Sequence, residues 1–365
     1  MLIEPSPGTS RGYSPGPGTV FLLMSGGVDS SVAALLLRRA EFDVVGVTMD
    51  IPGPKGRGED VRAAAETARE MGIPHYAAAA GEDFRRLVMQ PFVSSYLDGL
   101  TPNPCSDCNA RLKFGLLWDS LDEVFGPIRI ATGHYARIVR EGSHFFLARG
   151  RDAKKDQSYF LSGLARERLS KALMPLGDLT KDEVRSLARE AGLPVAERQE
   201  SMEICFTGEG NYRRLLDGLS TSPGLVVDES GAVLGTHDGV FGFTVGQRRG
   251  LGIASRDGLY VLRIDARGNR VVVGPRERVC RRRVRAQGTN LLYPGPPSTG
   301  YTMFGKTRSR SDPAPCDLVM LNGEWMEVLF HEPQFAPAPG QRLVLYDDAG
   351  RVVAGGEIEY CEEVG

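Results

Sequence analysis

The stretch Ser25-Gly26-Gly27-Val28-Asp29-Ser30-Ser31 decides the fold of the first half of this chain. It follows the apolar run Val20–Met24, which predicts a buried strand, and it leads into the Ala/Leu-rich segment Ser31–Ala40, which predicts a helix. Glycines let the backbone approach an anion closely. A helix N-terminus offers free N–H groups and the positive end of a dipole. Strand, glycine turn and helix in this order therefore predict a phosphate-binding loop.

The loop differs from a Walker A loop, because no Lys-Ser/Thr pair follows its last glycine. It resembles instead the PP-loop of the ATP pyrophosphatases, which cleave ATP between the α and β phosphates and adenylate a substrate oxygen. A Gly-Gly pair before a helix is by itself only a turn. The strand and the helix that flank it favour the nucleotide site.

The rest of the chain divides into regions that differ in their predicted secondary structure. Apolar runs at 44–49, 75–79 and 128–132 alternate with helix-period segments near 59–71, 82–97 and 110–125, which predicts a parallel sheet covered by helices. Thr180 and Glu183 form a predicted capping box for a further helix up to Ala191. After Cys205, short β-rich runs alternate with Gly, Pro and Asp turns, which predicts small β domains. We expect a flexible tail over residues 1–18, an α/β, Rossmann-like ATP-binding and catalytic domain over 19–205, a small β-rich domain over 206–283 and a β-barrel over 284–365.

Composition narrows the class of protein. With 41% apolar and 25% charged residues in a chain of 365, the sequence is typical of a globular protein, and no apolar run has the length of a membrane span. Six cysteines spread over this length do not predict a secreted disulfide framework, so we expect a cytoplasmic protein with functional thiols and no membrane partner. Between Arg248 and Arg310, 15 basic residues stand against three acidic ones. Such a segment is either a solvated face or the footprint of a nucleic-acid partner.

Three cysteines form the second candidate site. Cys105 and Cys108 stand in the loop Thr101-Pro102-Asn103-Pro104-Cys105-Ser106-Asp107-Cys108-Asn109, and Cys205 stands in Glu203-Ile204-Cys205-Phe206. Thiolates act as nucleophiles, sulfur carriers or metal ligands. Zinc would need a second ligand pair, and no other C-x-x-C or H-x-x-x-H is present. Buried, inert thiols are the interpretation for Cys280, Cys316 and Cys361.

Seven motifs together resemble the bacterial tRNA-specific 2-thiouridylases, and the resemblance runs from about Val20 to the C-terminus. They are SGGVDSS at 25–31, TPNPCSDCN at 101–109, ATGHYAR at 131–137, KDQSYFL at 155–161, EICF at 203–206, GQRRGLGI at 246–253 and EPQFAPAPGQ at 332–341. In this family ATP adenylates O2 of the wobble uridine, position 34 of the tRNA. A cysteine persulfide, loaded by a sulfur relay protein or a cysteine desulfurase, then delivers sulfur to C2.

The resemblance implies a role for particular residues. Cys205 matches the persulfide carrier, and Cys108 matches its partner nucleophile, with which it can form a disulfide. The ATP site, with Mg²⁺, matches Leu23, Met24, Ser25, Gly26, Gly27, Val28, Asp29, Ser30, Met49 and Gly133. Contacts with the target base match Asn103, Pro104 and Cys105. Contacts with the tRNA anticodon stem-loop match His134, Lys155, Asp156, Gln157, Arg308, Ser309 and Gln341.

Cys105 departs from the commonest pattern of the family, in which an aspartate proposed as acid/base stands at this position. The departure raises a second route to the same product, in which Cys105, Cys108 and Cys205 hold a [4Fe–4S] cluster with one open iron. Other PP-loop tRNA thiolases, a PP-loop amide ligase and a non-catalytic RNA-binding protein are the rival functions. Other PP-loop tRNA thiolases lack the context of the EICF and PAPGQ motifs. A non-catalytic RNA-binding protein would release no pyrophosphate, and an amide ligase would need no paired thiols.

Overall fold

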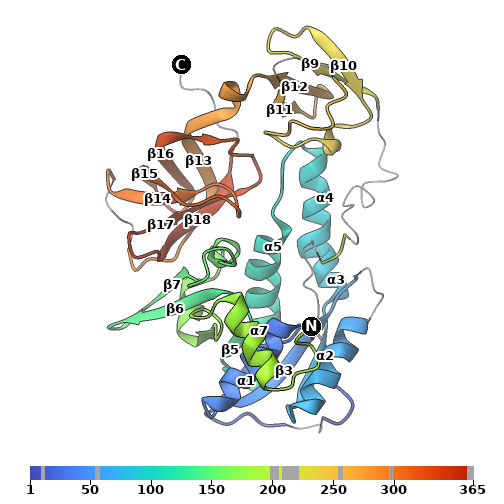
Figure 1. Cartoon of the computed structure of the whole chain (residues 1–365), viewed down its shortest axis with the longest axis vertical. Helices are drawn as coiled ribbons and strands as arrows, with labels where there is room; N and C mark the ends of the chain where they lie inside the picture. Colours follow the sequence, from blue (N-terminus) through green and yellow to red (C-terminus); the bar gives the residue numbers. More distant parts are fainter. Residues whose placement is uncertain are drawn as a thin grey trace. The chain divides into compact units, whose positions relative to one another are not determined.

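The computed structural model describes residues 1–9, 13–53, 58–197, 205–207, 222–253, 258–295, 297 and 299–359. The chain forms two compact units (Figure 1). The first unit comprises Met1–Val88, Cys105–Glu209 and Ala349–Val352. The second comprises Met89–Pro104, Gly210–Asp348 and Val353–Gly365. In the described residues, no helix combines the length and the apolar character needed to cross a membrane.

A six-stranded sheet forms the centre of the first unit, in the order β1-β4-β3-β2-β5-β8. The strands are β1 (Ile3–Pro5), β2 (Thr19–Leu23), β3 (Asp43–Asp50), β4 (His75–Ala79), β5 (Ile130–Thr132) and β8 (Ala172–Leu173). All neighbours pair in parallel except β1, which is antiparallel to β4. The apolar run of β2 is almost wholly buried, as expected for a strand covered on both faces. The predicted parallel α/β fold is confirmed.

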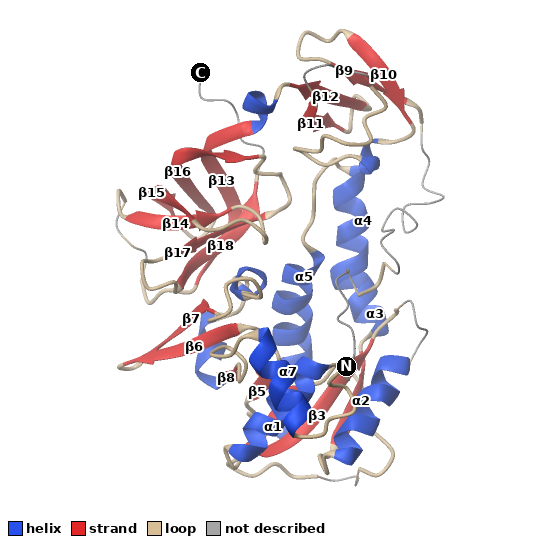
Figure 2. Cartoon of the chain, viewed as in Figure 1, coloured by secondary structure: helices blue, strands red, loops and turns tan. Residues whose placement is uncertain are grey.

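Helices cover this sheet (Figure 2). They are α1 (Val28–Arg39), α2 (Glu59–Glu70), α3 (Gly81–Phe84), α6 (Leu117–Phe125) and α7 (Lys181–Glu190). Side chains of α1, α2 and α7 pack with β2 and β3 into one apolar core. The predicted capping box of α7 is present, because the Thr180 side chain accepts from the backbone of Glu183 and the Glu183 side chain accepts from the backbone of Thr180.

Two features of the first unit were not predicted. A hairpin of β6 (Ala136–Glu141) and β7 (His144–Arg149) follows β5, and it leads into short 3-10 helices at Ser158–Leu161 and Arg166–Lys171. The segment Cys108–Leu116 (η2), between α5 (Pro104–Asp107) and α6, is π-helical and kinks at Gly115. π-Helical turns are rare and frequently mark functional sites.

The N-terminal segment differs from the flexible tail expected over residues 1–18. Ile3–Pro5 form an edge strand, and the Ser6 hydroxyl lies 2.7 Å from Nδ1 of the buried His75. Nε2 of His75 lies 2.8 Å from the Thr48 hydroxyl, which donates to the carbonyl of Met24. These contacts link the N-terminal segment to the residue that precedes the glycine loop.

The second unit contains two β structures and a helix. A four-stranded sheet, in the order β10-β9-β12-β11, comprises β9 (Gly224–Val227), β10 (Val233–His237), β11 (Tyr260–Asp265) and β12 (Arg270–Gly274). A closed barrel, in the order β13-β16-β15-β14-β17-β18, comprises β13 (Cys280–Leu291), β14 (Thr302–Lys306), β15 (Ala314–Leu321), β16 (Trp325–Phe335), β17 (Arg342–Tyr346) and β18 (Val352–Ile358). Helix α4 (Gln90–Leu97) belongs to this unit. The two predicted β domains, the second of which is the barrel, are confirmed, and the barrel's first strand begins before the boundary expected at residue 284.

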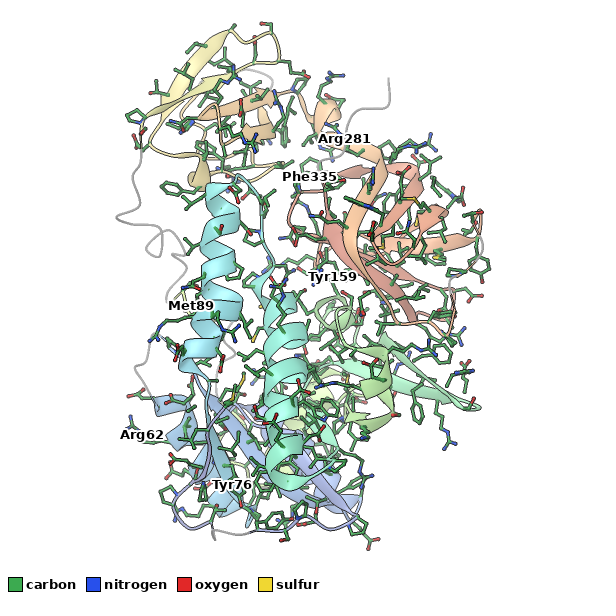
Figure 3. All side chains as sticks on the ribbon, turned by 180° about the vertical axis from the view of Figure 1, so that it is seen from behind. Arg62, Tyr76, Met89, Tyr159, Arg281 and Phe335 are labelled. Atoms are coloured by element: carbon green, nitrogen blue, oxygen red, sulfur yellow. The ribbon has the colours of Figure 1, made fainter. Side chains whose placement is uncertain are left out.

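Each unit has its own core of buried apolar side chains. Figure 3 labels Tyr159, which is fully buried in the first unit, and Phe335, which ends barrel strand β16 in the second. The barrel core is apolar and includes Cys316, which agrees with the interpretation of that thiol as buried and inert.

Candidate nucleotide and sulfur-transfer site

The glycine loop between β2 and α1 is closely packed and internally hydrogen-bonded. Gly26 has a φ of +69°, and a Cβ at this position would lie 3.1 Å from the backbone nitrogen of Ala64 in α2. The hydroxyls of Ser30 and Ser31 each donate to the carbonyl of Gly27 over 3.0 Å. Gly27, the N-cap of α1, brings no side chain to cap the first turn of this twelve-residue helix. The first backbone N–H groups of α1 are therefore open to an anion, as the sequence predicts.

Gly133 follows β5 at the same edge of the sheet and touches the loop backbone. A Cβ at Gly133 would lie 3.0 Å from the carbonyl carbon of Asp29 and 3.1 Å from the nitrogen of Ser30. Strands β2, β3 and β5 are parallel, so Leu23, Met49 and Gly133 lie at the carboxyl edge, where sheets of this kind bind ligands. The structure thus brings together the residues predicted for the nucleotide site.

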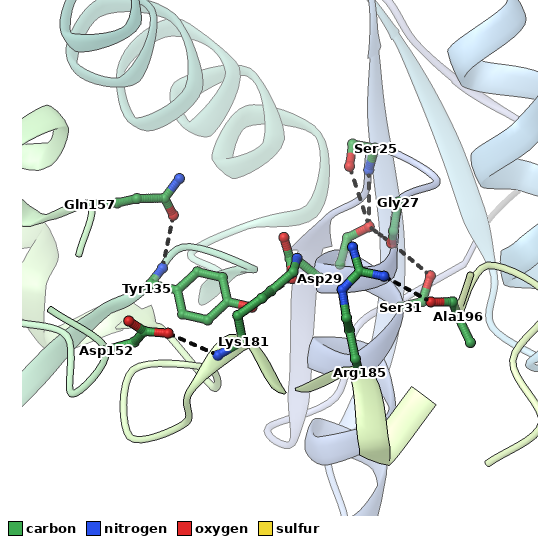
Figure 4. A network of polar contacts seen from close by, with 11 residues as sticks. Ser25, Gly27, Asp29, Ser31, Tyr135, Asp152, Gln157, Lys181, Arg185 and Ala196 are labelled. Carbon is green, nitrogen blue, oxygen red and sulfur yellow. Dashed lines mark hydrogen bonds and ion pairs between the residues drawn. The ribbon is translucent and has the colours of Figure 1, made fainter. Parts of the chain in front are cut away.

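Two residues that sequence reasoning missed fix the acidic side chain of the loop. Lys181, the first residue of α7, places Nζ 2.7 Å from Oδ1 of Asp29, and the Tyr135 hydroxyl donates to the same oxygen over 2.7 Å (Figure 4). The Lys181 side chain is only 9% exposed, and its ammonium lies over the Tyr135 ring. The loop therefore has a buried lysine after all, supplied from a distant helix.

In the motif at 155–157, the side chains of Asp156 and Gln157 form hydrogen bonds inside the first unit. The Asp156 side chain has no exposed area, and its carboxylate accepts from the backbone of Gly150 and from both the backbone and hydroxyl of Ser158. Gln157 accepts from the backbone nitrogen of Tyr135 over 2.9 Å. The buried Asp156 carboxylate holds this loop together through these partners, and its contact with tRNA stays a prediction. Lys155, which is half-buried, stays a prediction.

His134 lies beside the Thr132 hydroxyl, which contacts Nδ1, and its ring is 6.2 Å from that of Phe114. Burial, with a contribution from the positive charge of Lys113, lowers the pKa of His134 to about 3. The imidazole is therefore neutral at physiological pH. It can stack or share a hydrogen bond with RNA, but it offers no positive charge to a phosphate.

Cys105 and Cys108 lie one helical turn apart, at the junction of α5 and the π-helical segment η2. Cys105 is exposed and Cys108 is buried. Desolvation raises the pKa of both thiols, and the Lys113 ammonium opposes the increase. Lys113 follows Cys108 by five residues, about one turn of a π-helix, and it was not predicted from the sequence.

Cys205 belongs to the short described segment 205–207. Its neighbour Phe206 is buried and packs edge-on against Phe84 of α3, with ring centroids 5.4 Å apart. The carbonyl oxygen of Cys205 lies 3.8 Å from the Cβ position of Gly53, three residues beyond the end of β3. This places the cysteine near the carboxyl edge of the sheet.

The Cys205 thiol lies within electrostatic range of the other two. Desolvation by the surrounding protein, with the charges of Cys108 and Cys105, raises the pKa of Cys205 to about 12, while Lys113 lowers it. All three thiols are therefore protonated at neutral pH in this arrangement. The positive charge of Lys113 opposes the raised pKa of all three thiols.

The described residues do not present the three thiols as a metal site. Within the ranges that the structure describes, no three His, Cys, Asp or Glu side chains are grouped so as to hold a metal ion. We derive no step through a [4Fe–4S] cluster.

The remaining predicted contacts belong to the second unit. Gln341 donates to the carbonyls of Thr101 and Pro102, directly before Asn103 and Pro104. Arg308 donates to two backbone carbonyls, and Ser309 is half-buried beside it. In both cases the side chain that we predicted to contact tRNA is engaged within the protein.

Several arginines of the basic segment are also paired. Arg270 lies 2.7 Å from Asp265 and Arg278 lies 2.8 Å from Glu229, and Arg283 pairs with Glu327. The positive charge available to a partner is therefore smaller than the count in the sequence implies. Arg263 is exposed, and it lines two hollows of about 330 and 490 Å³ that share Leu262 and Arg281.

Comparison with known proteins covers nearly the whole chain. Residues 18–209 match the "tRNA methyl transferase HUP domain", residues 214–275 the "tRNA methyl transferase PRC-barrel domain" and residues 281–358 the "Aminomethyltransferase beta-barrel domain". The tRNA-specific 2-thiouridylase MnmA of Geobacter metallireducens is 42% identical over 368 residues, which span 93% of this chain and 96% of that protein. The MnmA of Brucella ovis is 40% identical over 363 residues, which span 94% and 90%. The chain belongs to the tRNA-specific 2-thiouridylase family.

Proposed function

We propose that this protein is an ATP-dependent tRNA 2-thiouridylase that replaces O2 of the wobble uridine with sulfur. The observation that carries the proposal is the position of Cys205 beside the chain that leaves β3, at the sheet edge that also holds the glycine loop. A phosphate loop and a sulfur nucleophile at one sheet edge suit a reaction that activates an oxygen and then displaces it.

In the first step, the uracil O2 attacks the α-phosphorus of ATP and pyrophosphate leaves. The loop residues Leu23–Ser30, with Met49 and Gly133, would hold the nucleotide, and the N–H groups of α1 would bind its phosphates. The family implies ATP with Mg²⁺. Both hydrogen bonds described for Asp29 reach Oδ1, so Oδ2 suits Mg²⁺, which prefers carboxylate oxygen.

In the second step, the terminal sulfur of a Cys205 persulfide attacks C2, and AMP leaves with the former O2. The Cys108 thiolate then attacks Sγ of Cys205, which forms a Cys108–Cys205 disulfide and releases the 2-thiouridine. An external thiol reductant must restore the pair, and a sulfur relay protein or a cysteine desulfurase must reload Cys205. Because the pKa values of Cys108 and Cys205 are raised, each thiol must lose its proton before it can react. The positive charge of Lys113 favours the thiolate form of both.

The tRNA must present an unstacked base, because O2 of a stacked uridine cannot reach the α-phosphate. We assign the base contacts to Asn103, Pro104 and Cys105, and we assign RNA contacts to His134, Lys155 and Ser309. The ATP-binding and catalytic domain would span 19–205, with the β-rich domain (206–283) and the barrel (284–365) binding the anticodon stem-loop. We expect the protein to act in the cytoplasm.

Two variants test the two steps separately. Cys205→Ser should abolish 2-thiouridine, measured by nucleoside analysis of the tRNA product, and leave pyrophosphate release intact. Asp29→Ala should stop pyrophosphate release as well. Cys280→Ser is the matched control for loss of a thiol, and it should keep both activities.

Thiolation by Cys205→Ser above a few per cent of wild type would refute the carrier role. Unchanged pyrophosphate release by Asp29→Ala would refute the ATP site. Iron and acid-labile sulfide are measured on the same wild-type sample. Full thiolation by iron-free protein supports the persulfide route, and activity that follows cluster content refutes it.

A further inference from the structure

The segment Phe335–Gln341 in the second unit joins three parts of the chain that are distant in sequence. It leaves barrel strand β16 and ends where β17 begins. One end of it contacts the loop that contains Val245 and Gly246, and the other end contacts the loop Thr101–Pro104. We call this segment the strap. The contacts at its two ends decide what Arg308 and Gln341 do.

At the first end, Arg308 fastens Ala336. The carbonyl of Ala336 accepts from Nε of Arg308 over 3.1 Å and from Nη2 over 2.7 Å, and Nη2 also donates to the carbonyl of Val245 over 3.0 Å. Ala336 is fully buried with a φ of +49°, a conformation that a residue other than glycine keeps only when its surroundings impose it. A Cβ at Gly246 would lie 2.5 Å from Cβ of Ala336. The junction is therefore close-packed around the arginine.

At the other end, Gln341 forms hydrogen bonds with the loop Thr101–Pro104. Its Nε2 donates to the carbonyl of Thr101 over 2.9 Å and to that of Pro102 over 3.3 Å. The backbone nitrogen of Thr101 donates in return to the carbonyl of Pro339 over 2.8 Å. A Cβ at Gly340, whose φ is +88°, would lie 2.9 Å from that nitrogen. The residues directly before Asn103 are thus held from both sides.

The strap is also joined to the barrel wall. The nitrogen of Gly340 donates to the carbonyl of Ile358, and the nitrogen of Ile358 donates to the carbonyl of Gln341. The amide nitrogen of Gln341 donates to two carbonyls, and Nε and Nη2 of Arg308 also donate to carbonyls. Most of the donor capacity of both side chains is therefore used inside the second unit.

We infer that Arg308 and Gln341 are positioning residues, which hold the strap so that the loop Thr101–Pro104 presents Asn103 and Pro104 to the target base. This inference rests on the proposed function for its effect on catalysis. Its structural part, the dependence of the loop on Gln341, stands independently of that function.

Salt dependence of tRNA binding separates positioning from direct contact. Loss of one phosphate contact lowers the slope of log K against log salt by about 0.9. Arg308→Ala should leave the slope at the wild-type value and lower kcat for thiolation at least tenfold, with a small change in KM. Gly246→Ala keeps the arginine and disturbs the same junction, so it should lower kcat in the same way. A fall in slope of about one for Arg308→Ala, restored by Arg308→Lys, would overturn the inference.

Hydrogen exchange in the protein without RNA gives the second readout. Gln341→Ala, and the similarly sized Gln341→Glu, which lacks the donors, should both speed exchange in a peptide containing Thr101 and Asn103. Wild-type exchange rates at Thr101 in both variants would overturn the inference. Wild-type protein that fails to thiolate tRNA would refute the proposed function alone, because the exchange result does not depend on activity.

Discussion

The ammonium group of Lys181 lies 2.7 Å from Oδ1 of Asp29, which joins the first residue of helix α7 to the glycine loop more than 150 residues earlier. The glycine loop carries no lysine of its own. The ion pair therefore offsets the negative charge of Asp29 and fixes the orientation of its carboxylate. Both properties matter when a nucleotide with several negative charges binds.

Lys181→Met should lower tRNA-dependent pyrophosphate release at least a hundredfold. The substitution removes the cation and leaves the Asp29 carboxylate with the Tyr135 hydroxyl as its described donor. Lys181→Arg should recover part of the rate, and Tyr135→Phe should cost only several-fold. Arg189→Ala, on the exposed side of the same helix, is the control. A Lys181→Met protein with normal pyrophosphate release would show that the pair only stabilises the fold.

Gly133→Ala should abolish ATP binding in a protein that still folds. The new Cβ would meet the backbone of Asp29 and Ser30 at 3.0 to 3.2 Å, and backbone atoms cannot move aside as a flexible side chain can. Isothermal titration with ATP measures the effect. Gly18→Ala, which meets open space, should bind ATP normally. Equal ATP affinity in the two variants would contradict the close approach as the reason for this glycine.

Lys113→Gln should slow the alkylation of Cys205 by iodoacetamide at pH 8. The thiolate is the reactive form, and the Lys113 charge is what opposes the raised pKa of about 12. Lys113→Arg keeps the charge and should react at nearly the wild-type rate. Mass spectrometry of the labelled peptide gives both rates. Equal labelling of wild type and Lys113→Gln would separate Lys113 from the thiol chemistry.

Acid should destabilise the fold through His75. Burial lowers its pKa from 6.5 to about 4, so between these values the unfolded chain binds a proton that the folded chain does not. The stability contributed by the neutral ring is fully present above pH 6.5 and is lost as the pH falls towards 4, in total about 3 kcal/mol. His75→Gln should flatten the pH dependence of the free energy of unfolding, measured with urea between pH 4.5 and 7. A slope equal to that of wild type would place the acid sensitivity elsewhere.

The sequence predicts those parts of the molecule that neighbouring residues determine. The glycine loop, the strand before it, helix α1 and the Thr180–Glu183 capping box depend on residues within a few positions, and all are present. The pairing of Lys181 with Asp29 depends on how α7 packs on α1, and no local pattern announces it. The burial of the Asp156 carboxylate likewise depends on how distant parts of the chain pack, so the sequence did not predict it.

The N-terminal strand had no sequence signal either. Ile3–Pro5 is too short to show a period, and its place at the sheet edge follows from pairing with β4. The π-helical stretch from Cys108 to Leu116 likewise depends on its surroundings, since the same residues have the composition of an ordinary helix.

The hydrogen bonds from Ser6 through His75 and Thr48 to Met24 have a practical consequence for anyone who makes the protein. Affinity tags are commonly fused to the first residue, and disordered leaders are commonly trimmed. Here the N-terminal segment is linked by hydrogen bonds to Met24, the residue before the glycine loop. Deleting residues 1–9 should therefore weaken ATP binding, although none of them lies in the loop. An enzyme preparation that lacks these residues should therefore be compared with one that contains them before low activity is attributed to the missing sulfur donor.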